Sequence, residues 1–151
     1  MIFQINGFKE IGTLNAELNS MMANGKTPLV TISDKKIDRS SAQNRMFHQW
    51  VRDIDRSTKH GTAYESGRCK YQYFLPVLQR SEKEEAIIAS FVAKETEKRV
   101  GFERFLKVLG NSVIGTTRFL TVKEFAEALT EMQIGEAQHN LTNPDYYGLR
   151  F

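Results

Sequence analysis

The sequence predicts an α+β fold, a small β-sheet with helices packed on it in a single domain. A chain of 151 residues suits one domain and can bury about 70% of the surface of its unfolded form. Two short runs, Ile2–Ile5 and Pro28–Ile32, have the alternating or β-rich composition of strands. Most of the remaining chain shows apolar residues at three- and four-residue steps, which is typical of amphipathic helices.

The first helix is predicted between the two strands. Its apolar residues are Phe8, Ile11, Leu14, Leu18 and Met21. Asn24-Gly25 is expected to end it, because these residues favour turns.

The second helix is predicted to begin with a capping box formed by Ser40 and Gln43. It has two opposite faces. One is apolar and contains Phe47, Trp50, Val51 and Ile54, and the other contains Arg45, Gln49, Arg52 and Arg56. His60-Gly61 is expected to end this helix. Trp50 is expected in the core because it lies on the apolar side.

Further helices are predicted from Ser66 to Leu75 with a break at Pro76, from Ser81 through Val92, and from Phe102 to Leu109. The segment 82–109 is a possible inserted helical arm. Residues 112–117 are expected to be extended or a loop.

The last helix is predicted to begin at a capping box of Thr121 and Glu124, with Leu120 stapled onto Phe125. The tail after Asn140 is expected not to be helical.

Positive charge is concentrated in one part of the chain. The whole protein has a formal charge of +3, but residues 35–59 hold seven basic and three acidic side chains, a net charge of +4. Residues 119–151 have a net charge of −3. This distribution makes nucleic acid a possible partner.

The sequence gives little support for catalysis or cofactors. The single cysteine, Cys69, excludes an internal disulfide and is expected to be a buried or incidental thiol. His48, His60 and His139 have no metal-ligand spacing with one another or with Cys69. No apolar run is long enough to span a bilayer and the N-terminus does not resemble a signal peptide. We therefore expect a cytoplasmic protein without cofactor, metal site, catalytic residues or membrane contact.

Several basic and amide side chains could contact phosphates. Arg45, Arg52 and Arg56 share one helix face, although a solvated face often contains arginines for no functional reason. Gln43 and Asn44 lie at a helix N-terminus, where backbone N–H groups favour an anion, but Gln43 could equally be the reciprocal partner of Ser40 in the cap. An exposed aromatic residue could also stack bases, and the sequence does not select among Tyr64, Tyr71 and Tyr73.

Two blocks of sequence resemble one known family. The segment 38–45, Asp-Arg-Ser-Ser-Ala-Gln-Asn-Arg, running into Trp50, is similar to the Arg-Ser-x-x-Gln-Asn-Arg motif of the bacteriophage NinB (lambda Orf) recombination proteins. In that family the motif likewise follows a strand resembling Pro28–Ile32. The segment 115–129, with Gly-Thr-Thr-Arg and then Val-Lys-Glu-Phe-Ala-Glu, resembles a second family motif. The matched segments cover about a third of the chain.

This resemblance implies a mixed α/β homodimer that binds single-stranded DNA in a basic cleft. It also implies a recombination mediator whose partners are the host single-strand-binding protein and a recombinase or annealing protein. Carried over by position, the resemblance makes Gln43, Asn44, Arg45 and Arg118 the candidate DNA-contacting residues. We also expect the neighbouring basic residues Arg39, Arg52 and Arg56 to contact DNA. Two alternatives remain open: a structure-specific, metal-dependent nuclease, and an adaptor that binds only proteins through the 82–109 segment or the aromatic tail.

Overall fold

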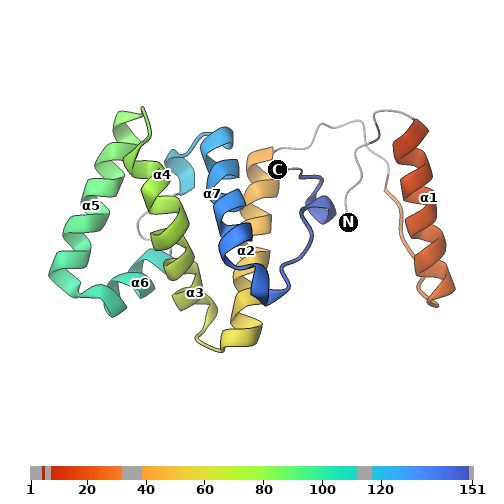
Figure 1. Ribbon diagram of the computed structural model, residues 1–151, viewed down its shortest axis with the longest axis horizontal. Coiled ribbons are helices and arrows are strands. Elements are labelled where there is room, and N and C mark those ends of the chain that lie inside the picture. Colours follow the sequence, from red (N-terminus) through yellow and green to blue (C-terminus); the bar gives the residue numbers. More distant parts are fainter. Residues whose placement is uncertain (1–4, 6–7, 32–38, 112–116, 150–151) are drawn as a thin grey trace.

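The computed structural model describes residues 5, 8–31, 39–111 and 117–149, and these residues form an all-helical structure (Figure 1). The longer helices are α1 (Phe8–Ala23), α2 (Arg39–Thr58), α3 (Thr62–Cys69), α5 (Glu84–Val100), α6 (Phe102–Gly110) and α7 (Val122–Gly135). A π-helical turn (Lys70–Phe74) joins α3 to the short α4 (Leu75–Gln79). Three 3-10 turns follow, at Thr117–Phe119, Ala137–His139 and Pro144–Tyr147.

The predicted α+β fold with a small sheet is therefore wrong, since no strand occurs among the residues described. The described part of the second predicted strand, 28–31, has no regular secondary structure, and Leu29 is 93% exposed. A β-rich run becomes a strand only where another segment pairs with its backbone and its side chains find a surface to pack on. The first predicted strand lies largely outside the described residues.

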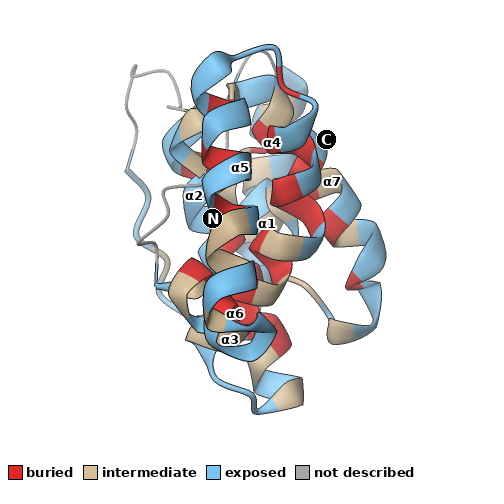
Figure 2. Ribbon diagram, turned by 90° about the vertical axis from the view of Figure 1, so that its left-hand side faces the viewer, coloured by how far each residue is buried: buried red, intermediate tan, exposed pale blue. Residues whose placement is uncertain are grey.

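The core lies between α2, α3, α4 and α7 (Figures 1 and 2). The helices α5 and α6 pack against α4 and α3. Trp50, Phe47 and Ile54 of α2 are fully buried, as their spacing predicted. Phe74 packs edge-on against Phe47 and Phe125, with ring centroids 5.0 and 5.1 Å away. The apolar side of α2 is thus joined to α7 through the π-helical turn.

Two glycines allow α3 and α6 to approach closely. A Cβ on Gly67 would lie 1.8 Å from the Leu106 carbonyl oxygen, and one on Gly110 would lie 1.8 Å from that of Ala63. The 82–109 segment is helical, as predicted, but it is packed on α3 and α4 instead of extending away from them.

Several predicted helix ends are confirmed. The helix α1 ends at Ala23, directly before Asn24-Gly25, and α6 ends at Gly110. At the start of α7 the capping box is complete: Thr121 accepts a hydrogen bond from Glu124 N, and Glu124 accepts one from Thr121 N.

Other predicted ends are wrong. Pro76 does not break its helix, because the chain stays helical from α3 through the π-helical turn into α4, and Pro76 lies in the first turn after the π-helical turn. Ser81 is not the cap of α5, which begins at Glu84. The tail is not wholly irregular, since Pro144–Tyr147 forms a 3-10 turn.

Candidate nucleic-acid interface

The two sequence blocks meet in space at the start of α2. An open pocket of about 320 Å³ is lined by Ser40, Ser41, Asn44, Thr117, Arg118 and Phe125. Asn44 and Arg118 are 74 positions apart in the chain, so their proximity results entirely from the fold. The pocket joins the first turns of α2 to the turn before α7.

Gln43 positions the two sides of this pocket. Its side chain is 2% exposed, and its amide donates a 2.9 Å hydrogen bond to the carbonyl of Val122, the first residue of α7. Gln43 is thus a positioning residue, and the expectation that it contacts DNA directly does not agree with its burial. The predicted Ser40 cap is also wrong, because α2 already begins at Arg39.

The pocket combines several groups that attract an anion. The first backbone N–H groups of a long helix have no intrahelical acceptor, and the helix dipole adds partial positive charge there. Arg118 is exposed, and its guanidinium lies over the Phe119 ring, 4.6 Å from the centroid. Stacking on an aromatic ring restricts the guanidinium to fewer orientations. Together with the Asn44 amide, these groups can bind a phosphate.

The remaining predicted arginines follow the exposed face of α2. Arg45, Arg52 and Arg56 are all exposed, as predicted. Arg52 donates a 2.7 Å hydrogen bond to Gln49, and Arg56 lies 3.4 Å from a carboxylate oxygen of Asp53. The structure describes only the backbone of Arg39.

Asp53 lies between this arginine face and the interior of the protein. Its side chain is buried, and one carboxylate oxygen accepts hydrogen bonds of 2.9 and 2.7 Å from the backbone and hydroxyl of Thr142. Trp50 also donates, at 2.7 Å, to the Thr142 carbonyl. The other carboxylate oxygen of Asp53 accepts a 2.9 Å hydrogen bond from Gln49 and is the one that lies 3.4 Å from Arg56. Asp53 therefore helps fix the C-terminal segment to α2 and also offsets part of the positive charge of this face.

The three tyrosines that could stack bases are buried or half-buried against other side chains of the protein. Tyr73 is 8% exposed and donates a 2.8 Å hydrogen bond to Glu136. Burial and this hydrogen bond raise the pKa of Tyr73. Tyr71 packs against the core and contacts the Phe102 ring. Tyr64 is half-buried beside His60.

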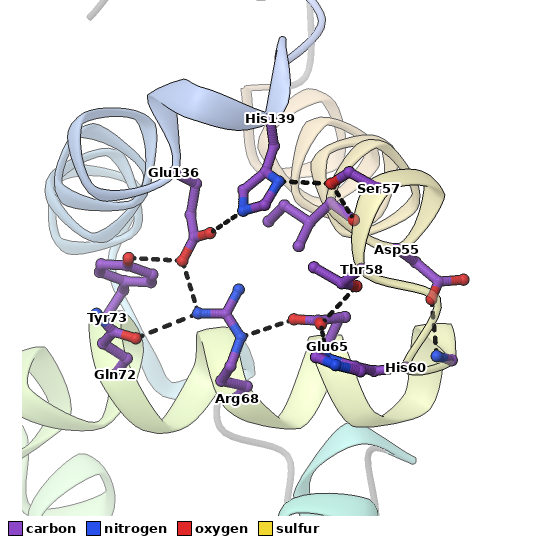
Figure 3. A network of polar contacts seen from close by, with 12 residues as sticks. Asp55, Ser57, Thr58, His60, Glu65, Arg68, Gln72, Tyr73, Glu136 and His139 are labelled. Atoms are coloured by element: carbon purple, nitrogen blue, oxygen red, sulfur yellow. Dashed lines mark hydrogen bonds and ion pairs between the residues drawn. The ribbon is translucent and has the colours of Figure 1, made fainter.

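A polar network that the sequence did not predict ties the C-terminal end of α2 to α3 and to the residues that follow α7 (Figure 3). Arg68 donates to Glu65 at 2.6 Å and to Glu136 at 2.7 Å. Burial disfavours the ionised form of Glu65, but hydrogen bonds from Arg68, Thr58 and His60 outweigh this and keep its pKa below the ordinary value. The i, i+3 spacing of Glu65 and Arg68 is visible in the sequence, whereas Glu136 enters only through the fold.

On the other side of the network, His139 lies between Ser57 and Glu136, with its Nδ1 2.5 Å from Ser57 Oγ. The polar groups of this network bind one another, so we interpret the network as a structural support for the C-terminal end of α2. Cys69 is fully buried, and burial raises the pKa of its thiol to about 12.

Comparison with family models, curated proteins and solved structures gave no match. No group of three or more His, Cys, Asp or Glu side chains in the described part of the chain is arranged to hold a metal ion. None of the described helices has the length and apolar character needed to cross a membrane.

Proposed function

We propose that this chain is a single-stranded DNA-binding accessory protein of phage-type recombination. The observation that supports this most strongly is the meeting of Asn44 and Arg118 in one pocket at the N-terminus of α2. The two segments that resemble the NinB family, 38–45 and 115–129, lie far apart in the chain. A shared phosphate site gives a physical reason for the presence of both motifs.

The DNA backbone would follow α2 from this pocket. One phosphate binds between Arg118 and the first turn of α2, and the next phosphates contact Arg45 and then Arg52 or Arg56. Arg45 and Arg52 are seven residues apart, which is about 10 Å along a helix. The contacts are to phosphates, so binding is expected to depend on salt and little on base sequence.

The proposed site is tested by titrating fluorescent single-stranded and duplex oligonucleotides at several salt concentrations, with and without magnesium. Arg118→Ala and Asn44→Ala should weaken binding, and Arg118→Ala should reduce the slope of log K against log salt by about 0.7. Arg104→Ala, which removes an exposed arginine from α6, is the matched control and should leave both quantities unchanged.

Three outcomes would contradict the proposal. Unchanged affinity and slope in Arg118→Ala would remove the pocket from the binding site. Absence of binding at low salt would favour the protein-only adaptor. Magnesium-dependent cleavage abolished by one Asp or Glu substitution would favour the nuclease.

The mediator role, with host single-strand-binding protein and recombinase as partners, is supported only by the resemblance. It predicts that the protein shortens the lag before recombinase assembles on DNA coated with single-strand-binding protein. Arg118→Ala should lose this effect in proportion to its lost DNA affinity. A lag unchanged by the wild-type protein would contradict the mediator role and leave DNA binding as the remaining proposal.

A further inference from the structure

One side of α5 is exposed (Figure 2), and its large side chains are apolar. Four large side chains form this face: Ile87, Ile88, Phe91 and Val92, which are 47%, 61%, 64% and 48% exposed. The residues that α5 buries are small, namely Ala86, Ala89, Ser90 and Ala93. A cluster of large apolar side chains on one surface indicates a contact site for another molecule.

Charged residues at the two ends of this face are arranged symmetrically. Glu84 and Glu85 are exposed at its N-terminal end, and Lys98 and Arg99 are exposed at its C-terminal end. Position 91 is midway between Glu84 and Lys98, and position 92 is midway between Glu85 and Arg99. The midpoints are therefore Phe91 and Val92, two of the apolar residues on the same face.

We propose that the occupant of this face is α5 of a second copy of the chain, packed antiparallel about a twofold axis close to Phe91 and Val92. A twofold axis places the same surface on both sides of the interface, so the surface must be complementary to itself. The antiparallel arrangement brings the acidic end of each helix beside the basic end of the other while the apolar side chains meet in the middle. A parallel pair would instead place acidic beside acidic and basic beside basic residues.

The size of the face sets the expected strength of the dimer. Burial of the four apolar side chains and the aliphatic parts of the flanking charged residues on both copies removes on the order of 1,000 Å² of surface, near the lower limit for a specific interface. We therefore expect a dissociation constant in the micromolar range. Lys98 is already 2.6 Å from Glu95 of its own helix, but such exposed pairs are weak and can rearrange on contact. This inference does not rest on DNA binding.

Sedimentation velocity from low to high micromolar concentration tests the interface. The wild-type protein should show a reversible monomer–dimer equilibrium, and Phe91→Glu should raise its dissociation constant roughly 30-fold or more, as for loss of an interface hot spot. Ile134→Glu is the matched control, since Ile134 is 68% exposed on α7, and it should dimerise like the wild type. Circular dichroism confirms that each variant is folded.

A charge exchange tests whether the charged ends of the two helices meet across the interface. A variant with E84K and E85K has only basic side chains at these four positions, and a variant with K98E and R99E has only acidic ones. Each alone should be monomeric, but an equimolar mixture should form a heterodimer, because both ends of the interface are then complementary. A monomeric wild type, dimerisation unaffected by Phe91→Glu, or a mixture that remains monomeric would each overturn the proposal.

Discussion

The helices α2 and α5 both cover the core, but they expose opposite kinds of side chain. On α2 the large apolar residues, such as Trp50, are fully buried and arginines face solvent. On α5 the small residues are buried and the large ones, such as Phe91, face solvent. Apolar periodicity therefore predicts a helix but not which side of that helix meets the core of the same chain.

The apolar faces of α2 and α5 should contribute very differently to stability. Trp50→Ala should lower the free energy of unfolding by about 3–5 kcal/mol, because it leaves a cavity and removes the hydrogen bond to the Thr142 carbonyl. Phe91→Ala should change the stability of the monomer by less than about 0.5 kcal/mol. Urea unfolding at a protein concentration below dimer formation measures both. Similar losses in the two variants would mean that the outer face of α5 is packed against the same chain.

The sequence predicted where the helices lie, although not all of their ends, because the spacing of apolar residues is a local property. It also predicted the orientation of α2, where apolar and cationic residues lie on opposite sides. The orientation of α5 could not be predicted in this way, because alanines such as Ala89 and Ala93 are compatible with either surface. Only the close approach of α5 to its neighbours makes small residues necessary there.

The sheet and the pocket show two further limits. Pro28–Ile32 has strand composition, but composition does not provide the pairing segment that a strand needs. Asn44 and Arg118 were each identified from local patterns, and Glu65 and Arg68 have visible helical spacing. Their meeting with distant partners depends on how α2, α3 and α7 pack, which no local pattern encodes.

Lys70 lies between α2 and α6, and its burial predicts how stability depends on pH. Its ammonium group is 3.0 Å from the Leu109 carbonyl of α6 and 6.0 Å from the centroid of the Phe47 ring of α2. Burial lowers the pKa of Lys70 to about 8, from an ordinary 10.5. Between these two pH values the unfolded chain binds more protons than the folded one, so stability should increase as pH rises.

The size of this effect is at most about 3 kcal/mol. Lys70→Met should lose this increase, and other groups that titrate in the same range cancel in the difference between wild-type and variant curves. Denaturant unfolding from pH 7 to pH 11 measures the difference. Parallel curves for the two proteins would show that Lys70 is not held in a desolvated position between the two sides.

The inner face of α5 can be tested by enlarging one of its small side chains. Ala93 is fully buried, whereas Val92, its neighbour in the chain, is 48% exposed. Ala93→Leu must push α5 away from its neighbours or force a strained rotamer, and should destabilise the monomer by about 1–3 kcal/mol. Val92→Leu also enlarges a side chain, but this side chain extends into solvent, so the stability of the monomer should not change. If both variants are equally stable, the alanine face of α5 has room for larger side chains, and the absence of large residues from that face cannot be explained by close packing.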